Sequence, residues 1–360
     1  MQGTWAVGKR RVHCQHLRRM SEPLPMLPLD TRGRPLRDLR ISVTDRCNFR
    51  CVYCMPRAVF GRDHAFVPRA ELLTFEEIAR LVRIFTRLGV EKVRLTGGEP
   101  LVRRELPTLV RMLAEIPGVR DLTLTTNGVL LTEHANALRA AGLHRVTISL
   151  DADDDPTFMR MNDAGVPVSR VLAGISAAEA AGLGPIKLNM VVKRGWNEHA
   201  LLSMARRFRG TGRILRFIEY MDVGHSNGWR LDEVVTADEI LATLSAEFPL
   251  EPMPPTYPGE VAERYGYADG SGEIGIIASV SRPFCGDCNR ARLSADGQLY
   301  TCLFATAGHD LRALVRGGAD DAQIETALRR IWEVRDDRYS EIRSAETVAL
   351  PKVEMSYIGG

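Results

Sequence analysis

Three cysteines, Cys47, Cys51 and Cys54, lie within one short segment near the start of the chain. Disulfides need specific Cα separations, so three thiols this close together form a poor disulfide set. Three thiolates from one loop suit a cubane iron–sulfur cluster, in which each sulfur binds one iron. The fourth iron then lacks a protein ligand, and catalytic metal sites keep such an open position for a substrate. The alternative is a structural zinc site with a distant fourth ligand.

A second triplet, Cys285, Cys288 and Cys302, lies far along the chain. Alone, its spacing is typical of a zinc ribbon that lacks one ligand. Beside the first triplet, a second three-cysteine cluster is at least as good an interpretation. The only other cysteine is Cys14, which lies in a basic segment and for which we expect no metal role. The second cluster would therefore also keep an open iron.

Composition narrows the class of protein. The 360 residues carry 48 basic and 45 acidic side chains, a net charge of +3, which does not indicate nucleic-acid binding. Free thiols indicate a reducing cytoplasm, and no stretch reaches the roughly 20 apolar residues that span a membrane. Residues 1–30 are expected to form a disordered basic tail, although a transit peptide or an upstream start would also explain the basic residues 1–21.

Strand-like and helix-like segments alternate from residue 39 onward. Strands are expected over 39–43, 92–95, 121–125, 145–148, 186–192 and 214–220, each followed by a polar turn and a helical pattern. Six such units predict a parallel sheet. Polar residues after every strand favour a barrel, whose ligands bind at the carboxyl ends of its strands, and six units instead of eight favour an incomplete one. The alternative is an open doubly wound sheet, which binds its ligand at one crevice.

A run of prolines over 249–259 separates this barrel region from the rest of the chain. We therefore expect two domains after the tail, a partial barrel over 31–248 and a second unit over 249–360 that contains the second cysteine triplet.

Two polar turns at strand ends are candidates for ligand binding. The glycines of Gly97-Gly98-Glu99-Pro100 let a backbone approach a ligand closely, and the carboxylate can accept from an ammonium group. Ser149 and Asp151 follow the fourth expected strand, where they either contact a ligand or cap the strand end.

Basic residues also fall where a barrel would bury them. Arg40, Arg94, Lys187 and Arg216 lie on expected strands, and buried cations are costly unless an anion pairs with them. Arg290 and Arg292, two residues apart beside the second triplet, would share one face of an extended segment. Arginine presents paired donors that match phosphate oxygens. The pattern predicts an anionic ligand, although Arg290 and Arg292 would also suit a solvated surface.

The first triplet, with Tyr53 before its last cysteine, resembles the signature of the radical S-adenosylmethionine (SAM) superfamily. With the Gly-Gly-Glu-Pro turn, the second triplet, the segment 289–292 and the final Gly359-Gly360, the chain resembles the molybdenum cofactor biosynthesis family of GTP 3′,8-cyclases over roughly residues 31–360.

This resemblance implies an incomplete (β/α)6 barrel whose open side is closed by a C-terminal α+β unit. It implies two [4Fe-4S] clusters, one on Cys47, Cys51 and Cys54 and one on Cys285, Cys288 and Cys302. It implies SAM contacts from Tyr53, Gly98, Ser149 and Met221. It implies GTP contacts from Arg40, Arg94, Thr125, Lys187, Arg290, Ala291 and Arg292, with Arg216 as a weaker candidate. It implies that the first triplet, Arg290, Arg292, Gly359 and Gly360 take part in catalysis.

The reaction implied is the radical cyclisation of GTP to 3′,8-cyclo-7,8-dihydro-GTP, the first step of molybdenum cofactor biosynthesis. The implied partners are a flavodoxin- or ferredoxin-type electron donor, a downstream cyclic pyranopterin monophosphate synthase and a second copy of the chain in a homodimer. The rival interpretations are another radical SAM enzyme with an auxiliary cluster, such as a peptide-maturation enzyme, and a non-enzymatic zinc- or cluster-bearing binding module.

Overall fold

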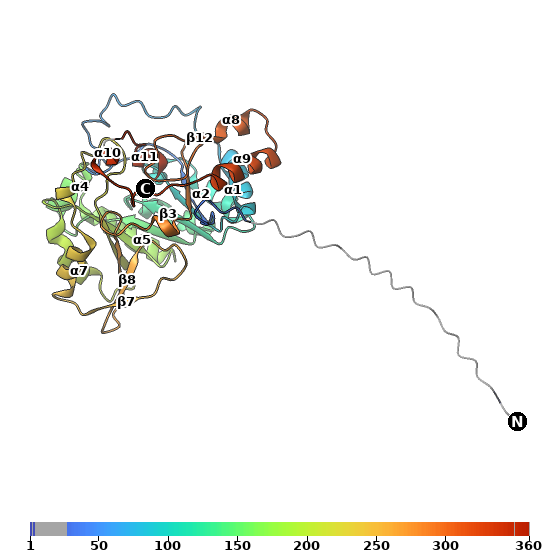
Figure 1. The fold of residues 1–360 in the computed structure, drawn as a ribbon. Helices are drawn as coiled ribbons and strands as arrows, with labels where there is room; N and C mark the ends of the chain where they lie inside the picture. Colours follow the sequence, from blue (N-terminus) through green and yellow to red (C-terminus); the bar gives the residue numbers. More distant parts are fainter. Residues whose placement is uncertain (2, 4–26, 349, 360) are drawn as a thin grey trace.

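The computed structural model of the chain describes residues 1, 3, 27–348 and 350–359 (Figure 1). The expectations for Cys14, for Gly360 and for most of the basic tail lie outside the described residues. Asp30, the last residue of the expected tail, is buried and pairs with the nearby Arg34 and with Arg335 from the C-terminal part of the chain.

One mixed sheet organises the described chain, with the strand order β12-β11-β10-β1-β2-β3-β4-β5-β6-β9-β8-β7. The first six strands are parallel and pair in the order in which they occur. Their bounds are Asp38–Ser42 for β1, Lys92–Thr96 for β2, Asp121–Thr126 for β3, Arg145–Ser149 for β4, Lys187–Val192 for β5 and Ile214–Glu219 for β6. The six strands that the sequence predicts are all present, with ends that differ by at most one residue.

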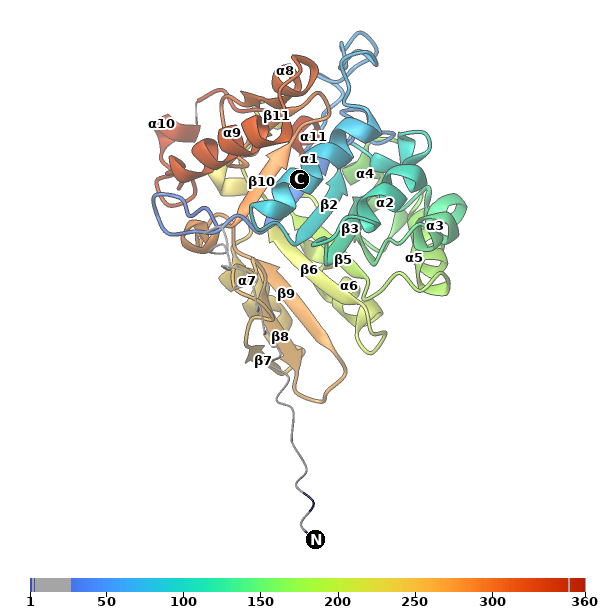
Figure 2. The ribbon, with the colours of Figure 1, turned by 90° about the vertical axis from the view of Figure 1, so that its right-hand side faces the viewer.

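The helices of the barrel region pack on the outer face of this sheet (Figure 2). They are α1 (Phe75–Arg87), α2 (Leu106–Ala114), α3 (Leu131–Ala140), α4 (Asp155–Asn162), α5 (Val168–Ala180), α6 (Leu201–Phe208) and α7 (Ala237–Ser245). Thr74 and Thr236 form capping boxes with Glu77 and Glu239 at the starts of α1 and α7. The apolar face of α1, which includes Leu81 and Phe85, is fully buried.

The side chains of the parallel strands alternate between the helices and the inside of the barrel. On β5, Leu188, Met190 and Val192 are buried against the helices, whereas Lys187 and Asn189 are only half-buried on the inner face. The same alternation on β6 directs Arg216 inward. The outer face therefore supplies the hydrophobic core, and the inner face is left to polar residues.

The C-terminal part of the chain adds a strand to each end of the parallel row. β9 (Glu273–Ile277) pairs with β6, and β10 (Arg290–Leu293) pairs with β1, both in parallel. Antiparallel neighbours extend the two ends: β8 (Glu263–Tyr267) and β7 (Leu250–Met253) beyond β9, and β11 (Gln298–Tyr300) and β12 (His309–Asp310) beyond β10. In the described chain β12 and β7 are the ends of the sheet, so the barrel does not close. The expected incomplete barrel is confirmed.

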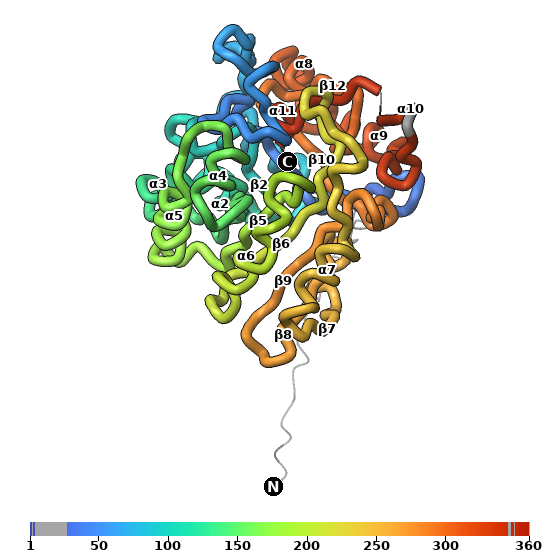
Figure 3. Tube along the Cα trace, turned by 90° about the vertical axis from the view of Figure 1, so that its left-hand side faces the viewer, coloured from blue at the N-terminus to red at the C-terminus, as the bar shows by residue number. Residues whose placement is uncertain are grey.

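Short C-terminal helices complete the fold around β10 (Figure 3). They are α8 (Leu311–Arg316), α9 (Asp321–Glu333), α10 (Ala345–Val348) and α11 (Met355–Ile358). Helix α9 packs beside α1, and α11 lies against β1, so the end of the chain returns to its first strand. Among the described helices, none is both long and apolar enough to cross a membrane.

Candidate functional site

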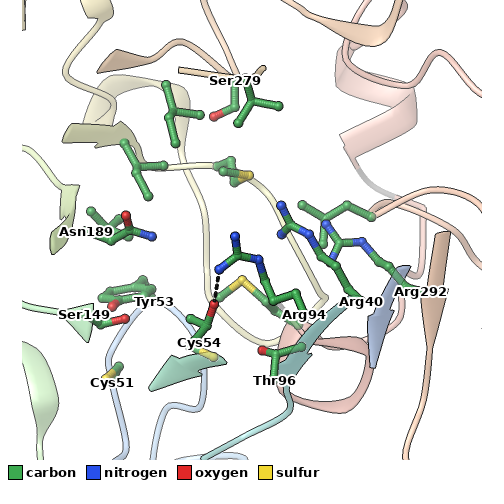
Figure 4. A pocket seen from close by; sticks show the side chains of 18 of the residues that line it. Arg40, Cys51, Tyr53, Cys54, Arg94, Thr96, Ser149, Asn189, Ser279 and Arg292 are labelled. Atoms are coloured by element: carbon green, nitrogen blue, oxygen red, sulfur yellow. Dashed lines mark hydrogen bonds between the residues drawn. The ribbon is translucent and has the colours of Figure 1, made fainter. Parts of the chain in front are cut away.

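One large cavity lies inside the partial barrel, and both cysteine triplets line it. Figure 4 shows part of its lining, with Cys51 and Cys54 of the first triplet. Most of the site residues that the sequence predicts line it with them: Arg40, Tyr53, Arg94, Gly98, Thr125, Ser149, Arg216, Met221, Arg290 and Arg292. Two do not. Lys187 lies on the inner face of β5, one pleat from the lining residue Asn189, and Ala291 points into the hydrophobic core from the opposite face of β10. Any ligand contact of Ala291 must therefore come from its backbone.

The two triplets lie at opposite ends of one pair of strands. Cys47 follows the carboxyl end of β1, whereas Cys288 precedes the start of β10. The strands are parallel, with Asp38 opposite Arg290 and Arg40 opposite Arg292. The inward-facing arginines of both strands consequently lie between the two groups of thiols.

Backbone hydrogen bonds fix the first cysteine loop. The amides of Arg50 and Val52 donate to the carbonyls of Asn162 and Met161 at the end of α4, at 3.0 and 3.1 Å. The Arg50 guanidinium donates to the carbonyls of Cys47, Phe49 and Phe60. The Phe49 amide donates to the Cys47 sulfur at 3.3 Å. The loop is therefore held in shape by contacts that leave its sulfurs directed at the cavity.

The Gly-Gly-Glu-Pro turn packs directly against this loop. The Gly98 amide donates to the Thr44 carbonyl at 2.8 Å, and a Cβ on Gly98 would lie 2.4 Å from the Arg46 carbonyl oxygen. Only glycine permits this approach. Burial raises the pKa of Glu99 to about 7, although its oxygens accept hydrogen bonds from Leu101, Thr126 and Asn127. Glu99 thus joins β2 to the end of β3 at the edge of the cavity.

Tyr53 and Asp151 are joined across the cavity entrance. The Tyr53 hydroxyl donates to the Asp151 carboxylate at 2.8 Å, and the Val191 amide donates to the other oxygen at 3.0 Å. Burial raises the pKa of Asp151 to about 6. These bonds position Tyr53 beside Ser149, as Figure 4 shows.

The second triplet rests on a buried ionic network that the sequence did not reveal. Asp30 pairs with Arg34 at 2.6 Å and with Arg335 at 3.0 Å. Arg34 donates to the Cys285 carbonyl, and Arg335 donates to the Cys288 carbonyl at 2.8 Å and its sulfur at 3.3 Å. Burial opposes ionisation of Cys288, but the guanidiniums of Arg290 and Arg335 outweigh it and lower its pKa to about 6. Three distant segments of the chain therefore support this site.

Buried arginines line the space between the triplets. Burial and the neighbouring cations lower the pKa of Arg40 to about 10 and that of Arg216 to about 9, so both remain charged at neutral pH. Arg94 donates to Thr125 at 2.9 Å and to Thr147 at 3.2 Å. Among the described residues, Nε of Arg40 and Nε of Arg94 find no hydrogen-bond partner. Grouped cations with free donors form a site for a polyanion.

The end of the chain enters the same space. The Arg292 guanidinium donates to the Gly359 carbonyl, and a Cβ on Gly359 would lie 2.1 Å from the Thr96 methyl group. Thr96 lines the cavity. Gly359 has a φ of 78°, which also favours glycine. The close contact with Thr96 and the positive φ therefore each exclude residues other than glycine at this position.

Comparisons with known proteins agree with this geometry. Residues 41–208 match the family model of the radical SAM superfamily, and residues 213–341 match that of Molybdenum Cofactor Synthesis C. A GTP 3′,8-cyclase of Acidothermus cellulolyticus is 56% identical over 92% of this chain and 98% of its own. The GTP 3′,8-cyclases of Xanthomonas axonopodis and Staphylococcus aureus are 52% and 48% identical, with the same coverage of each chain.

This chain belongs to the GTP 3′,8-cyclase family. Its fold also resembles the crystal structure of Streptococcus suis SuiB bound to S-adenosylmethionine, at 15% identity and a TM-score of 0.58, over 86% of this chain and 68% of that one. As a radical SAM member of the cyclase family, the chain has SAM and iron–sulfur clusters as cofactors.

The thiols fit such clusters. All six cysteines in the described residues are free. Burial raises the pKa of Cys47 and of Cys302 to about 12, so these thiols ionise only when a metal replaces the proton. No three His, Cys, Asp or Glu side chains in the described ranges converge on one metal ion. A cubane does not need that convergence, because its ligands bind different irons.

Several supporting residues of this cyclase site escaped the sequence analysis. Asp30, Arg34 and Arg335 carry no motif, and only their burial in the structure distinguishes them from surface charges. Arg50 offered a weak signal, because it lies between the cysteines of the first triplet.

Proposed function

We propose that this chain is a GTP 3′,8-cyclase, which converts GTP to (8S)-3′,8-cyclo-7,8-dihydro-GTP in the first step of molybdenum cofactor biosynthesis. One observation carries the proposal: two cysteine triplets line one cavity, and arginines that suit a triphosphate lie between them. A zinc-bearing binding module needs neither the inward cations nor a glycine held by Arg292 against Thr96.

Cys47, Cys51 and Cys54 would hold the cluster that binds SAM, with Tyr53, Gly98, Ser149 and Met221 as SAM contacts. The cluster supplies one electron that splits SAM into methionine and a 5′-deoxyadenosyl radical. The position of Ser149 beside Tyr53 supports this assignment, and Gly98 lines the same cavity.

Arg40, Arg94, Lys187, Arg290 and Arg292 would bind GTP, with Thr125 and the Ala291 backbone beside them and Arg216 as a further triphosphate contact. Orientation of two reactants can lower a barrier by about 7–11 kcal/mol. The guanidiniums come from β1, β2, β6 and β10, four strands of one rigid sheet, so they suit that task.

The reaction balances as follows. The 5′-deoxyadenosyl radical takes the hydrogen atom from C3′ of GTP and becomes 5′-deoxyadenosine. The C3′ radical bonds to C8 of guanine, and one further electron and one proton complete the dihydro product. Cys285, Cys288 and Cys302 would hold a second cluster near the base. Arg292 would hold Gly359 next to the reacting groups.

We further propose a reducing cytoplasm as the location, because the six described thiols must stay free. Flavodoxin- or ferredoxin-type proteins would supply electrons, and a cyclic pyranopterin monophosphate synthase would consume the product.

The test is anaerobic incubation of the reconstituted protein with SAM, dithionite and GTP deuterated at C3′. We expect a cyclised GTP and 5′-deoxyadenosine that carries the deuterium. About eight irons per chain are expected for two cubanes. Zinc in place of iron, or deoxyadenosine without deuterium, would refute the proposal.

A further inference from the structure

A hollow on the outer surface reaches the first cysteine loop from behind. Cys47, Arg50, Arg57 and Arg62 line it. Cys47 also lines the inner cavity, so one residue separates the outside of the molecule from the site of the first triplet. Electron tunnelling weakens steeply with distance, so a protein bound over this hollow would be well placed to deliver an electron.

The segment that lines most of the hollow is rich in arginine, although Asp163 pairs with one of these arginines, Arg57. Between residues 46 and 70 the chain has five arginines, Arg46, Arg50, Arg57, Arg62 and Arg69, and a single acid, Asp63. The whole chain is nearly neutral by comparison, with a net charge of +3. We call residues 46–69 the arginine loop. Figures 2 and 3 show its later part projecting from the body of the molecule near α8.

Aromatic side chains stiffen the arginine loop. The Arg46 guanidinium lies 5.1 Å from the centre of the Phe66 ring. Phe66 packs against His64 at 4.7 Å, and His64 packs against Phe60 at 4.6 Å. A fixed loop binds a partner without the entropy cost of ordering it. The charges are therefore presented in a defined arrangement.

Two of the arginines remain available to a partner. Arg62 is exposed. The side chain of Arg57 is 61% exposed, although it pairs with the Asp163 carboxylate at 2.9 Å and donates to the Asp163 carbonyl. Exposed ion pairs contribute little, so a carboxylate of a partner can compete for Arg57. Val59, which is also exposed, lies between them in the sequence and adds an apolar contact. A small apolar centre with a charged rim suits a weak, transient interface.

We propose that the arginine loop is the docking site of a small acidic protein that carries one low-potential electron, of the flavodoxin or ferredoxin type. This inference rests on the proposed function, because it needs the cluster on the first triplet. One electron leaves the reduced cofactor of the carrier, which is oxidised, and enters that cluster through the wall formed by Cys47. Complementary charge sets the rate of encounter and the orientation of the partner.

The test compares two variants of the cluster-loaded protein. Arg57→Glu/Arg62→Glu reverses two charges at the hollow. Arg120→Glu/Arg207→Glu makes the same change at two exposed arginines outside the arginine loop, before β3 and at the end of α6. Affinity for reduced flavodoxin is measured anaerobically, without GTP, at several salt concentrations. Iron content and dithionite-driven SAM cleavage are measured in parallel.

We expect the first variant to lose affinity for flavodoxin by about tenfold or more at low salt, with a weaker salt dependence. The second variant should bind within about twofold of the unchanged protein, and both should keep full iron and full dithionite-driven cleavage. The proposal would be overturned if the first variant bound flavodoxin as tightly as the unchanged protein, or if both variants lost the same affinity. The proposal would also be overturned if an oligonucleotide bound the arginine loop and lost affinity in the first variant as much as flavodoxin does.

Failure of this proposal is distinct from failure of the proposed function. The docking assay uses neither GTP nor its product, whereas the cyclisation assay uses dithionite in place of the carrier. A chain that cyclises GTP with dithionite but binds flavodoxin elsewhere would refute only the docking site.

Discussion

At the scale of single residues, the arginines on the inner face of the barrel lower the stability of the ligand-free protein and favour the binding of an anion. Arg40 and Arg216 are charged groups with lowered pKa values in a largely desolvated space. Nε of Arg40 has no hydrogen-bond partner among the described residues. Such groups destabilise the folded state until an anion arrives. The protein without ligand is therefore less stable than an apolar lining would make it.

Replacement of Arg40 by methionine tests this exchange. We expect the Tm of the ligand-free, cluster-loaded protein to rise slightly, in line with a gain of about 1 kcal/mol, because a partly buried cation is removed. Affinity for GTP should fall at least about tenfold. Arg37→Met, which removes a half-buried partner of Glu91 on the segment that enters the same strand, is the control and should neither raise the Tm nor weaken GTP binding. A clear fall in Tm for Arg40→Met would contradict the argument.

Lys187 predicts a pH dependence of GTP binding. Burial lowers its pKa to about 8, with Arg216 as the next largest cause. The ammonium group is present below that pH and is lost above it. If the triphosphate needs the charged form, affinity should be constant near pH 7 and fall up to about tenfold per pH unit above 8. Equilibrium binding measured from about pH 7 to about 9 shows the trend. Lys187→Arg should remove it, since arginine stays charged.

At the scale of elements, the sequence predicts local structure well, but it predicts the pairing of strands that are distant in the chain poorly. The six parallel strands and the capping boxes of α1 and α7 follow from alternation and from short capping motifs. The positions of β9 and β10 at the two ends of the parallel row do not, because pairing partners more than 50 residues away leave no local pattern. Helix α4 was missed as well, although it holds the first cysteine loop.

The C-terminal segment, residues 352–359, is fixed in place by contacts with three other parts of the chain. Lys352 pairs with Asp222 at 3.1 Å, and Glu354 accepts from the His225 amide and the Ser226 hydroxyl. The Tyr357 hydroxyl donates to Asp296 at 2.6 Å. These contacts hold the segment so that Gly359 meets Thr96 and Arg292.

Deletion of Gly359 and Gly360 should abolish cyclisation and leave the iron content unchanged. Gly359→Ala should reduce cyclisation strongly, because its Cβ would overlap the Thr96 methyl group. Thr96→Ser removes that methyl group, so the double variant should recover part of the activity. The remaining deficit, about 1 kcal/mol, reflects the positive φ. Product formation by chromatography is the measurement, and no recovery in the double variant would argue against this contact.

At the scale of the whole molecule, the site residues could be predicted as a set but not as an arrangement. The cysteines and the inward cations are visible in the sequence because their residue types are unusual on strands or in close triplets. That the two triplets lie at opposite ends of β1 and β10 depends on the pairing of Asp38 with Arg290, which only the fold reveals. The network of Asp30, Arg34 and Arg335 was likewise invisible, because ordinary arginines resemble surface residues until they are buried.

This arrangement predicts a separation of functions between the triplets. Cys47→Ser should eliminate SAM cleavage, because the first cluster is lost. Cys285→Ser should keep cleavage of SAM and lose most GTP turnover, since its site lies at the far end of the cavity. Iron content and deoxyadenosine formation with and without GTP distinguish the two. If both variants lose only thermal stability, the triplets are structural.

The pairing of β1 with β10 also has a consequence for the order in which the protein is made. A ribosome delivers β1 and the first cysteine loop early, but β10 and its arginines come hundreds of residues later, and Gly359 later still. A chain still in synthesis therefore has the segment that would hold the first cluster and lacks the segment that would bind the triphosphate. We expect a chain that stops before β10 to bind no GTP, whatever happens at its first cysteine loop.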